Sequence, residues 1–366
     1  MNKKWNYKKL GDVCTVERGG SPRPIDDYIT DNPAGINWIK IGDTNDESMF
    51  ITQTAQKILP EGMKKSRYVR PGDFLLSNSM SFGRPYILKI DGCIHDGWLV
   101  LRDKENVFDK RFLYYYLSSK PTYQKFKMMA VGGVVNNLNS EMVRSVDVPI
   151  PGKDEQVKIA DVLDKISRII AYQKKELVKS DDLIKARFVE VTKSSTTEPT
   201  RMGDVASYIN GYAFKPSDWQ QNGIPIIRIQ NLNDKNATYN HFNGTINEKY
   251  RVRNGDVLVS WATHLEAYIW NGGDAWLNQH IFRVVFDKIP INKTYFVYST
   301  EEALRQAFKN AHGFKPTMEH IKRSDFENAI INLPPVAIQE QFANFVAQID
   351  KSKVMKRLRL STISFC

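Results

Sequence analysis

Apolar residues with a seven-residue spacing mark the middle of the chain. They recur at Leu163, Ile170, Leu177, Ile184 and Val191. Because seven residues are close to two helical turns, the spacing predicts one long helix whose apolar stripe needs a helical partner. From Asp154 to Lys193 such a helix would be about 60 Å long at about 1.5 Å per residue.

The end of the chain carries a similar but shorter stripe, from Val336 onward. We expect the two helices to pack antiparallel, with Leu163, Ile170, Leu177 and Ile184 buried against Phe342, Val346 and Ile349. The alternative is that each helix packs on its own domain. The apolar stripe is interrupted in the second helix, where Lys353 and Lys356 occupy the positions equivalent to Ile170 and Gln173.

Outside these helices the pattern is one of short apolar runs separated by turns. Strand-like runs occur at residues 38–41, 74–77, 98–101 and 146–150. The turn sequences Arg70-Pro-Gly-Asp and Arg253-Asn-Gly-Asp each lead into such a run. One helical stretch, residues 110–119, interrupts the strands and is matched by residues 293–308.

These matches belong to an internal repeat that covers the chain. Leu10-Gly-Asp-Val returns as Met202-Gly-Asp-Val, and Val69-Arg-Pro-Gly-Asp-Phe-Leu-Leu-Ser returns as Val252-Arg-Asn-Gly-Asp-Val-Leu-Val-Ser. The offset is 192 residues between Gly11 and Gly203, and 183 residues between Gly72 and Gly255. The order of the matches indicates a duplication. A duplication predicts the domain architecture of the chain more directly than it predicts its function.

The repeat and the stripes together predict an α+β protein with two pseudo-symmetric domains and two long helices. The expected parts are a first recognition-type domain at 1–152, a long helix at 153–195, a second domain at 196–335 and a shortened helix at 336–366.

Composition and charge narrow the class of partner. Lys and Arg total 52 against 41 Asp and Glu, for a net charge of +11, which suits a polyanion such as nucleic acid. No apolar run is long enough to span a membrane. Three scattered cysteines argue against disulfides and zinc, and we expect a cytoplasmic protein without a bound metal.

The chain resembles the specificity subunit of type I restriction–modification enzymes. The resemblance rests on Leu10-Gly-Asp-Val with Arg18-Gly-Gly-Ser-Pro-Arg-Pro, on Arg70-Pro-Gly-Asp-Phe-Leu-Leu-Ser, and on the segment from Val148 to Asp164 with its echo from Leu333. Each motif alone is loose, but their order and duplication are specific.

The resemblance implies a DNA-binding subunit with no active site of its own. Two target-recognition domains would each read half of a split site in double-stranded DNA, and the helices would set the unread spacer. Two modification subunits would dock on the chain, and restriction subunits would join for cleavage. This chain would bind no cofactor, because S-adenosylmethionine, ATP and Mg²⁺ would be bound by the partner subunits.

Candidate DNA contacts are polar residues in the loops that follow the predicted strands, since base reading needs exposed donors and acceptors. In the first copy they are Arg18, Ser21, Arg23, Lys40, Ser77, Asn78, Ser79, Arg84, Asn136 and Asn137. In the second copy they are Asn210, Tyr212, Lys215, Arg228, Ser260, Trp261, Thr263, His264 and Lys315. The copies diverge after Ser77 and Ser260, as two different half-sites require, although ordinary surface loops also diverge.

Motifs for catalysis are missing. Leu333-Pro-Pro-Val lacks the polar and aromatic residues that flank the prolines in adenine methyltransferases, and no GxxxxGK motif is present for ATP. Two rival hypotheses stay open: a stand-alone nuclease or methyltransferase with dispersed catalytic residues, and a basic protein-interaction scaffold.

Overall fold

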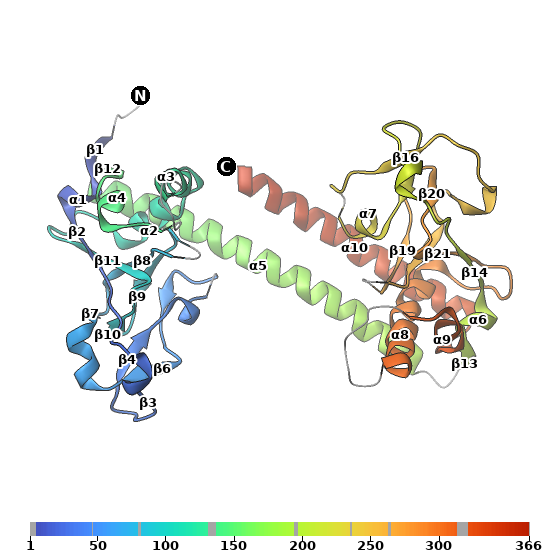
Figure 1. The fold of residues 1–366 in the computed structure, drawn as a ribbon, viewed down its shortest axis with the longest axis horizontal. Coiled ribbons are helices and arrows are strands. Elements are labelled where there is room, and N and C mark those ends of the chain that lie inside the picture. The colour runs from blue at the N-terminus through green and yellow to red at the C-terminus, as the bar shows by residue number, and fades with distance from the viewer. Residues whose placement is uncertain are drawn as a thin grey trace. The chain divides into compact units, whose positions relative to one another are not determined.

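The computed structural model forms two compact units, Met1–Tyr172 and Gln173–Cys366 (Figure 1). It describes residues 5–45, 47–79, 82–130, 137–193, 197–234, 236–262, 265–312 and 321–365. The division falls inside the long helix α5 (Lys153–Thr192), so each unit contains one part of that helix.

The first unit consists of two five-stranded sheets, a two-stranded ribbon and a set of helices. The sheets have the orders β3-β6-β4-β10-β7 and β2-β11-β8-β9-β5, and β1 pairs with β12. The strands are β1 (Asn6–Lys9), β2 (Cys14–Arg18), β3 (Ile29–Thr30), β4 (Ile36–Ile39), β5 (Phe50–Ile51), β6 (Gln56–Ile58), β7 (Arg67–Val69), β8 (Phe74–Ser77), β9 (Pro85–Leu88), β10 (Gly92–Ile94), β11 (Trp98–Asp103) and β12 (Asp147–Ile150). The helices are α1 (Leu10–Val13), α2 (Lys110–Ser118), α3 (Lys120–Ala130), α4 (Ser140–Arg144) and the start of α5.

The second unit repeats this plan with two four-stranded sheets. Their orders are β14-β21-β18-β19 and β16-β15-β20-β17, and β13 pairs with β22. The strands are β13 (Glu198–Arg201), β14 (Ser207–Asn210), β15 (Ile224–Ile227), β16 (Asn240–Phe242), β17 (Arg251–Val252), β18 (Val257–Ser260), β19 (Glu266–Ile269), β20 (Ala275–Leu277), β21 (Ile281–Val285) and β22 (Ile330–Leu333). The helices are α6 (Met202–Val205), α7 (Ile229–Asn233), α8 (Lys293–His312), α9 (Arg323–Asn328) and α10 (Val336–Phe365).

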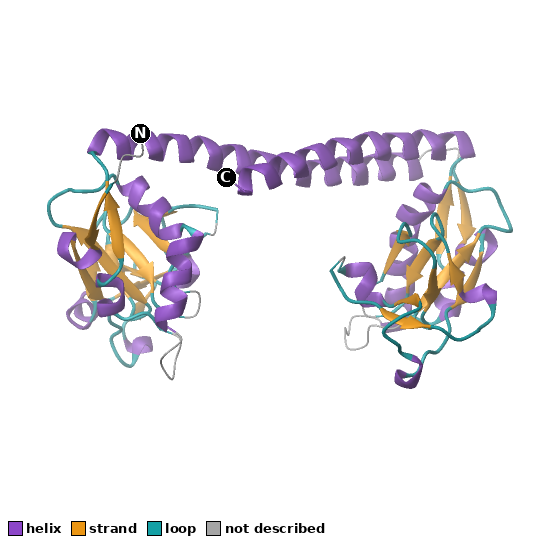
Figure 2. Ribbon diagram, turned by 90° about the horizontal axis from the view of Figure 1, so that it is seen from above, coloured by secondary structure: helices purple, strands orange, loops and turns teal. Residues whose placement is uncertain are grey.

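In each unit one core lies between the central sheet and the helices and another lies between the two sheets, so the central sheet is buried on both faces. Figure 2 shows the strands of each unit with the helices beside them. In β8, Phe74 and Leu76 join the core beneath the helices, whereas Leu75 joins the core between the sheets. Successive strand residues point to opposite faces, so both faces need apolar residues. This explains why β8 and its counterpart β18 are continuous apolar runs.

The duplicated turn that leads into β8 and β18 forms as predicted. Gly72 and Gly255 adopt φ angles of 92° and 84°, which favour glycine. The Asp73 carboxylate accepts the Arg70 backbone N–H at 3.1 Å, and Asp256 accepts that of Arg253 at 2.9 Å.

The second part of α5 packs antiparallel to α10 within the second unit. Ile184 and Val191 are buried in one cluster with Phe342 and Val346, and Ile349 packs against it. The direction follows from the ion pairs, since Lys353 contacts Asp181 while the later Lys356 contacts the earlier Glu176 (2.7 and 3.7 Å). Figures 1 and 2 both show this stretch side by side with α10.

Three sequence expectations about the helices are refined. The single stretch predicted at 110–119 is followed by a second helix, α3; Asp109 caps the start of α2, and the extended conformation of Ser119 separates the two helices. Of the predicted stripe, Leu163, Ile170 and Leu177 are only half-buried. Where the stripe of α10 drifts, the Lys353 side chain is 13% exposed and pairs with Asp181, so an ion pair replaces the apolar contact.

Candidate nucleic-acid interface

Parallel strand pairing brings separate polar loops of the first unit to one sheet edge. Strand β4 runs parallel to β10, with Ile39 opposite Ile94, so Lys40 and His95 follow neighbouring strand ends. The antiparallel pairs of β11 place Leu99 opposite Arg18 and Trp98 opposite Ser77. The ends of β2, β4, β8 and β10 therefore meet at the loop that enters β11.

The loop after β2 is pressed against the loop after β10. Gly19 N–H donates to the Trp98 carbonyl at 2.9 Å, and Gly20 N–H donates to the Ile94 carbonyl at 3.2 Å. A Cβ atom on Gly19 would lie 2.1 Å from the His95 carbonyl oxygen. Only glycine fits this approach at position 19, whereas a Cβ on Gly20 would lie 3.0 Å from the Lys65 carbonyl oxygen.

Asp96 joins the polar side chains of these loops into what we call the first edge cluster: Arg18, Ser21, Arg23, Asn78, His95 and Asp96. Its carboxylate accepts a hydrogen bond from Ser21 Oγ at 2.9 Å and lies 3.6 Å from the Arg23 guanidinium. Its backbone carbonyl accepts from Arg18 Nε at 3.0 Å and from Asn78 Nδ2 at 2.9 Å.

The protonation states of the acid and the imidazole follow from these contacts. Burial acts to raise the pKa of Asp96, but the Ser21 hydrogen bond, its own backbone N–H and the charges of His95 and Arg18 lower it overall. Burial lowers the pKa of His95. A neutral imidazole has one acceptor nitrogen, so the ring accepts either the Gly97 N–H at Nδ1 (2.6 Å) or the Ile41 N–H at Nε2 (3.2 Å). The cluster is therefore an anionic carboxylate beside a neutral imidazole.

The predicted contacts of the first copy differ in their exposure. Arg18, Arg23 and Arg84 are exposed, Ser21, Lys40, Ser79 and Asn137 are half-buried, and Asn136 lies outside the described residues. Lys40 Nζ donates to Gln56 Oε1 at 2.7 Å. Asn78 is 1% exposed, so it positions the Asp96 loop from within.

Three predicted contacts require correction because their side chains are buried: Asn78, described above, and the serines Ser77 and Ser260. Ser77 is 1% exposed, and its hydroxyl accepts the Arg84 backbone N–H at 3.0 Å. Ser260 is fully buried, and its hydroxyl donates to the Ala262 carbonyl at 3.1 Å. Both serines hold the ends of their own loops in shape and are not available to DNA.

The second unit repeats the backbone framework. Gly211 and Tyr212 N–H groups donate to the carbonyls of Ile281 (3.2 Å) and Leu277 (2.8 Å), and a Cβ on Gly211 would lie 2.1 Å from the Asn278 carbonyl oxygen. Strand β15 runs parallel to β20, with Ile227 opposite Leu277. Asn278 therefore holds the place of His95.

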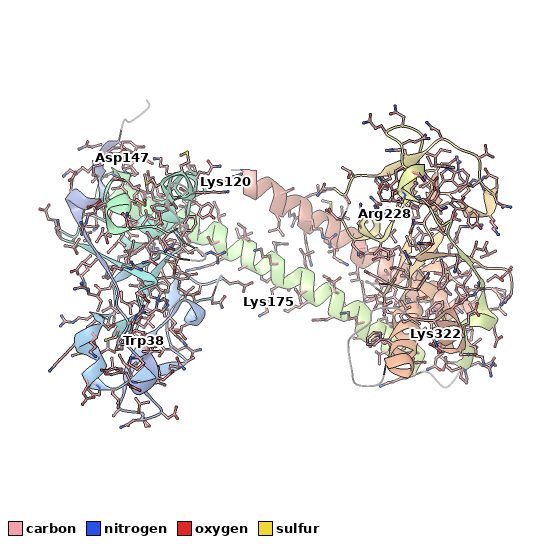
Figure 3. All side chains as sticks on the ribbon, in the orientation of Figure 1. Trp38, Lys120, Asp147, Lys175, Arg228 and Lys322 are labelled. Atoms are coloured by element: carbon pink, nitrogen blue, oxygen red, sulfur yellow. The ribbon has the colours of Figure 1, made fainter. Side chains whose placement is uncertain are left out.

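The side chains on this second framework are different. The second edge cluster consists of Asn210, Arg228, Trp261, Gln279 and His280. The Trp261 and His280 rings lie 5.4 Å apart, and Gln279 Nε2 lies 3.2 Å from His280 Nε2. Arg228, labelled in Figure 3, is held by Asn240 at 3.2 Å and lies 5.0 Å from the Trp219 ring.

The remaining predicted residues of the second copy are distributed as follows. Tyr212 packs in an aromatic cluster, 4.9 Å from the Phe214 ring and 5.6 Å from the Tyr250 ring. Asn210 and Lys215 are exposed. Thr263, His264 and Lys315 lie outside the described residues.

Sequence reasoning missed the loops that organise both clusters, namely residues 95–97 and 278–280. A signal was present, because the 183-residue offset aligns Ile94-His-Asp-Gly-Trp with Leu277-Asn-Gln-His-Ile. Short polar runs between two apolar strands in both copies are candidates for a shared edge. Within the described residues, no group of His, Cys, Asp and Glu side chains is placed to hold a metal ion.

Comparison with known proteins identifies the family. The sequence profile described as "Type I restriction modification DNA specificity domain" matches residues 2–180 and 194–361. The chain belongs to this family. The two matched segments correspond to the two copies of the repeat, as the resemblance in the sequence led us to expect.

Individual relatives agree with this assignment. The MjaIX specificity subunit of Methanocaldococcus jannaschii is 24% identical, over 94% of this chain and 86% of its own length. The EcoBI specificity subunit of Escherichia coli is 29% identical, over 44% of this chain and 37% of its own length.

Solved structures share the fold. A chain in a structure on the assembly and conformational transition of the type I R-M system is similar with a TM-score of 0.64 at 16% identity, over 98% of this chain and 94% of that one. The S subunit from M. genitalium is similar with a TM-score of 0.54 at 11% identity, over 100% and 94%. In the described part of the chain, no helix is both long and apolar enough to cross a membrane.

Proposed function

We propose that this type I DNA specificity chain reads a bipartite target in double-stranded DNA, one half-site with each edge cluster. The observation that carries the proposal is one backbone framework with two sets of side chains. Both clusters contain an arginine, an imidazole and an amide, but the first adds a second arginine, a serine hydroxyl and the Asp96 carboxylate, whereas the second adds an indole and a second amide. Different donor and acceptor sets on equivalent loops suit two different base sequences.

We further infer that the chain acts as a non-catalytic subunit. Two modification subunits would dock on it and bring S-adenosylmethionine to the target adenine, and restriction subunits with ATP and Mg²⁺ would join for cleavage. In this arrangement the net charge of +11 supplies phosphate contacts, and the edge clusters supply base contacts.

The test is an exchange of one domain. Residues 1–150 are replaced by the equivalent domain of another specificity subunit, and the chimera is expressed with its modification subunits. Methylome sequencing should show one new half-site and one unchanged half-site. A chimera that altered both halves of the methylated motif would contradict the two-reader proposal.

The rival hypothesis of a stand-alone enzyme needs its own assay. The purified chain, supplied with S-adenosylmethionine or with Mg²⁺, should neither methylate nor cleave DNA. Methyl transfer or cleavage that disappeared on mutating residues of this chain would establish the rival.

A further inference from the structure

A buried glutamine holds the start of the long helix against an equivalent loop in each unit. Gln156 Oε1 accepts the Asp109 N–H at 2.8 Å, and its Nε2 donates to the Pro151 carbonyl at 2.9 Å. Gln339 Oε1 accepts the Asn292 N–H at 2.9 Å, and its Nε2 donates to the Pro334 carbonyl at 2.8 Å. The contacts of Asp109 and Asn292 are therefore equivalent, whereas the loops differ in backbone conformation three residues earlier, where Asn106 has a positive φ and Ile289 does not.

In the first unit a lysine of the helix closes this loop. Lys153 Nζ donates to the backbone carbonyls of Asn106 at 2.7 Å and Phe108 at 2.8 Å, and it lies 3.2 Å from Asn106 Oδ1. One ammonium thus satisfies three oxygens of the loop. Asn106 adopts a φ angle of 52°, a conformation in which Asn is favoured over most residues.

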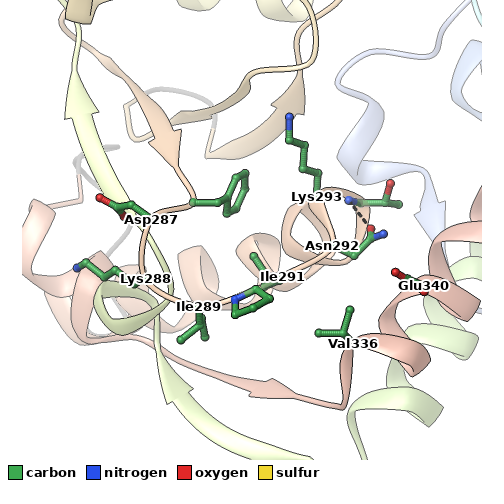
Figure 4. Close-up of a pocket in the computed structure, with 11 residues that line it drawn as sticks. Asp287, Lys288, Ile289, Ile291, Asn292, Lys293, Val336 and Glu340 are labelled. Carbon is green, nitrogen blue, oxygen red and sulfur yellow. Dashed lines mark hydrogen bonds between the residues drawn. The ribbon is translucent and has the colours of Figure 1, made fainter.

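In the second unit the closing lysine is replaced by Val336, and the equivalent place is a pocket of about 720 Å³ (Figure 4). The pocket lies between residues 286–294 and the first turn of α10. Val336 is 40% exposed at its wall. One helical turn later, Glu340 lines the pocket where the first unit has Val157.

The two replacements change the charge of the site in the same direction. A cation is lost at position 336 and a carboxylate is gained at position 340. Asp287 adds a second carboxylate to the lining, and its Oδ1 accepts the Ser207 N–H at 3.1 Å. The pocket's own cations are engaged elsewhere, since Lys288 Nζ donates to the Gly203 carbonyl and Lys293 Nζ to the Gly255 carbonyl at 2.6 Å.

The loop oxygens are also unused. Ile289 and Ile291 correspond to Asn106 and Phe108, and within the described residues neither of their carbonyls accepts a hydrogen bond. Backbone carbonyls next to carboxylates form a site for a cationic donor. The first unit shows which group fits such a place, namely the ammonium of a lysine.

We propose that this pocket receives a lysine side chain from a partner protein, which takes the place that Lys153 holds in the first unit. The inference rests on the proposed function, because the partner is a subunit that assembles on this chain. Charge complementarity to Glu340 and Asp287 and the lysine already present in the equivalent site identify the occupant. The two units would consequently offer different contacts to otherwise equivalent partners.

The first test fills the pocket from within. Val336→Lys recreates the closing lysine of the first unit, and Ala337→Lys adds the same charge on the neighbouring exposed position, which does not line the pocket. We expect Val336→Lys to raise the dissociation constant of the complex with the modification subunits about tenfold. Ala337→Lys should leave it within about twofold of the wild-type value.

The second test identifies the occupant chemically. A carbodiimide joins a carboxylate to an amine only where the two are in contact, so the assembled complex is treated and digested for mass spectrometry. We expect Glu340 to be linked to a lysine of a modification subunit, and Glu340→Gln to abolish that link. A link only to a second copy of this chain, or to its own lysines, would overturn the proposal.

The two proposals fail in different ways. If the wild-type chain forms no complex with modification subunits and does not bind DNA, the proposed function fails. If it assembles normally, but Val336→Lys assembles as tightly as wild type and Glu340 forms no link to a partner, only the lysine pocket is refuted.

Discussion

Asp96 offers the sharpest test of the first edge cluster, because one carboxylate holds both a hydroxyl and a guanidinium. Asp96→Asn keeps the shape of the side chain and the backbone carbonyl that binds Arg18 and Asn78. It removes the charge that faces Ser21 at 2.9 Å and Arg23 at 3.6 Å. The substitution therefore isolates the electrostatic part of the cluster.

The magnitude follows from these two contacts. A hydrogen bond to a charged group contributes about 1 kcal/mol more than a neutral one. The pair with Arg23 contributes at most about 1 kcal/mol, because the Arg23 side chain is 82% exposed. We expect the free energy of unfolding to fall by about 1–2 kcal/mol, which leaves the chain folded.

DNA binding should change in two directions. Cognate affinity should fall about tenfold, because Ser21 and Arg23 lose their fixed orientation toward a base edge. Affinity for a scrambled duplex should hold or rise, because a negative charge beside the phosphates is gone, and the salt dependence should steepen. Fluorescence anisotropy with both duplexes at several salt concentrations measures the ratio of cognate affinity to scrambled affinity.

The control is Asp12→Asn, which makes the same change of charge in α1, before the opposite end of β2. It should leave the ratio of cognate to scrambled affinity unchanged. If Asp96→Asn raised both affinities equally, as Asp12→Asn would, Asp96 would be only a surface charge and the orientation argument would be refuted.

Four further outcomes follow from the structure. Burial lowers the pKa of His95, so the stability contributed by its neutral form is complete above the ordinary pKa of about 6.5 and is lost as the pH falls below that value. Thermal unfolding measured from pH 7.5 to 5.5 should show this loss of stability, and His95→Asn should make the loss smaller. Phe342→Ala should cost about 3–5 kcal/mol in denaturant unfolding, because the ring is fully buried, and a cost below 1 kcal/mol would disprove its place in the helix pair. Gly19→Ala should destabilise the first unit by about 1–3 kcal/mol, because its Cβ would collide with a backbone carbonyl; an unchanged melting temperature would contradict that contact. Four residues inserted after the exposed Lys175 (Figure 3) add about 6 Å of helix and should lengthen the unread spacer by one or two base pairs, and a methylated motif with an unchanged spacer would rule out a ruler.

The sequence by itself determined the features that depend on local periodicity and on the repeat. A seven-residue spacing predicts a long helix because each apolar residue returns to the same face after two turns, and α5 spans Lys153–Thr192. The turn at Arg70–Asp73 was readable because glycine and aspartate act on neighbouring backbone atoms. The duplication allowed the two copies to be aligned, and the duplicated motifs indicated the family.

Only the tertiary structure decided which residues meet. The parallel pairing of β4 with β10 joins segments more than fifty residues apart, and it brings His95 and Asp96 to the end of the Arg18 loop. Burial of Ser77 and Ser260 depends on sheets that cover both faces of a strand, so their polar character in the sequence was misleading. Lys353 fills a stripe position because an aspartate of the other helix faces it. The proposed lysine pocket was likewise found only by comparing the surroundings of Lys153 with those of Val336 in the structure. The sequence shows that a lysine in one helix is a valine in the other, but it does not show that this difference leaves a pocket.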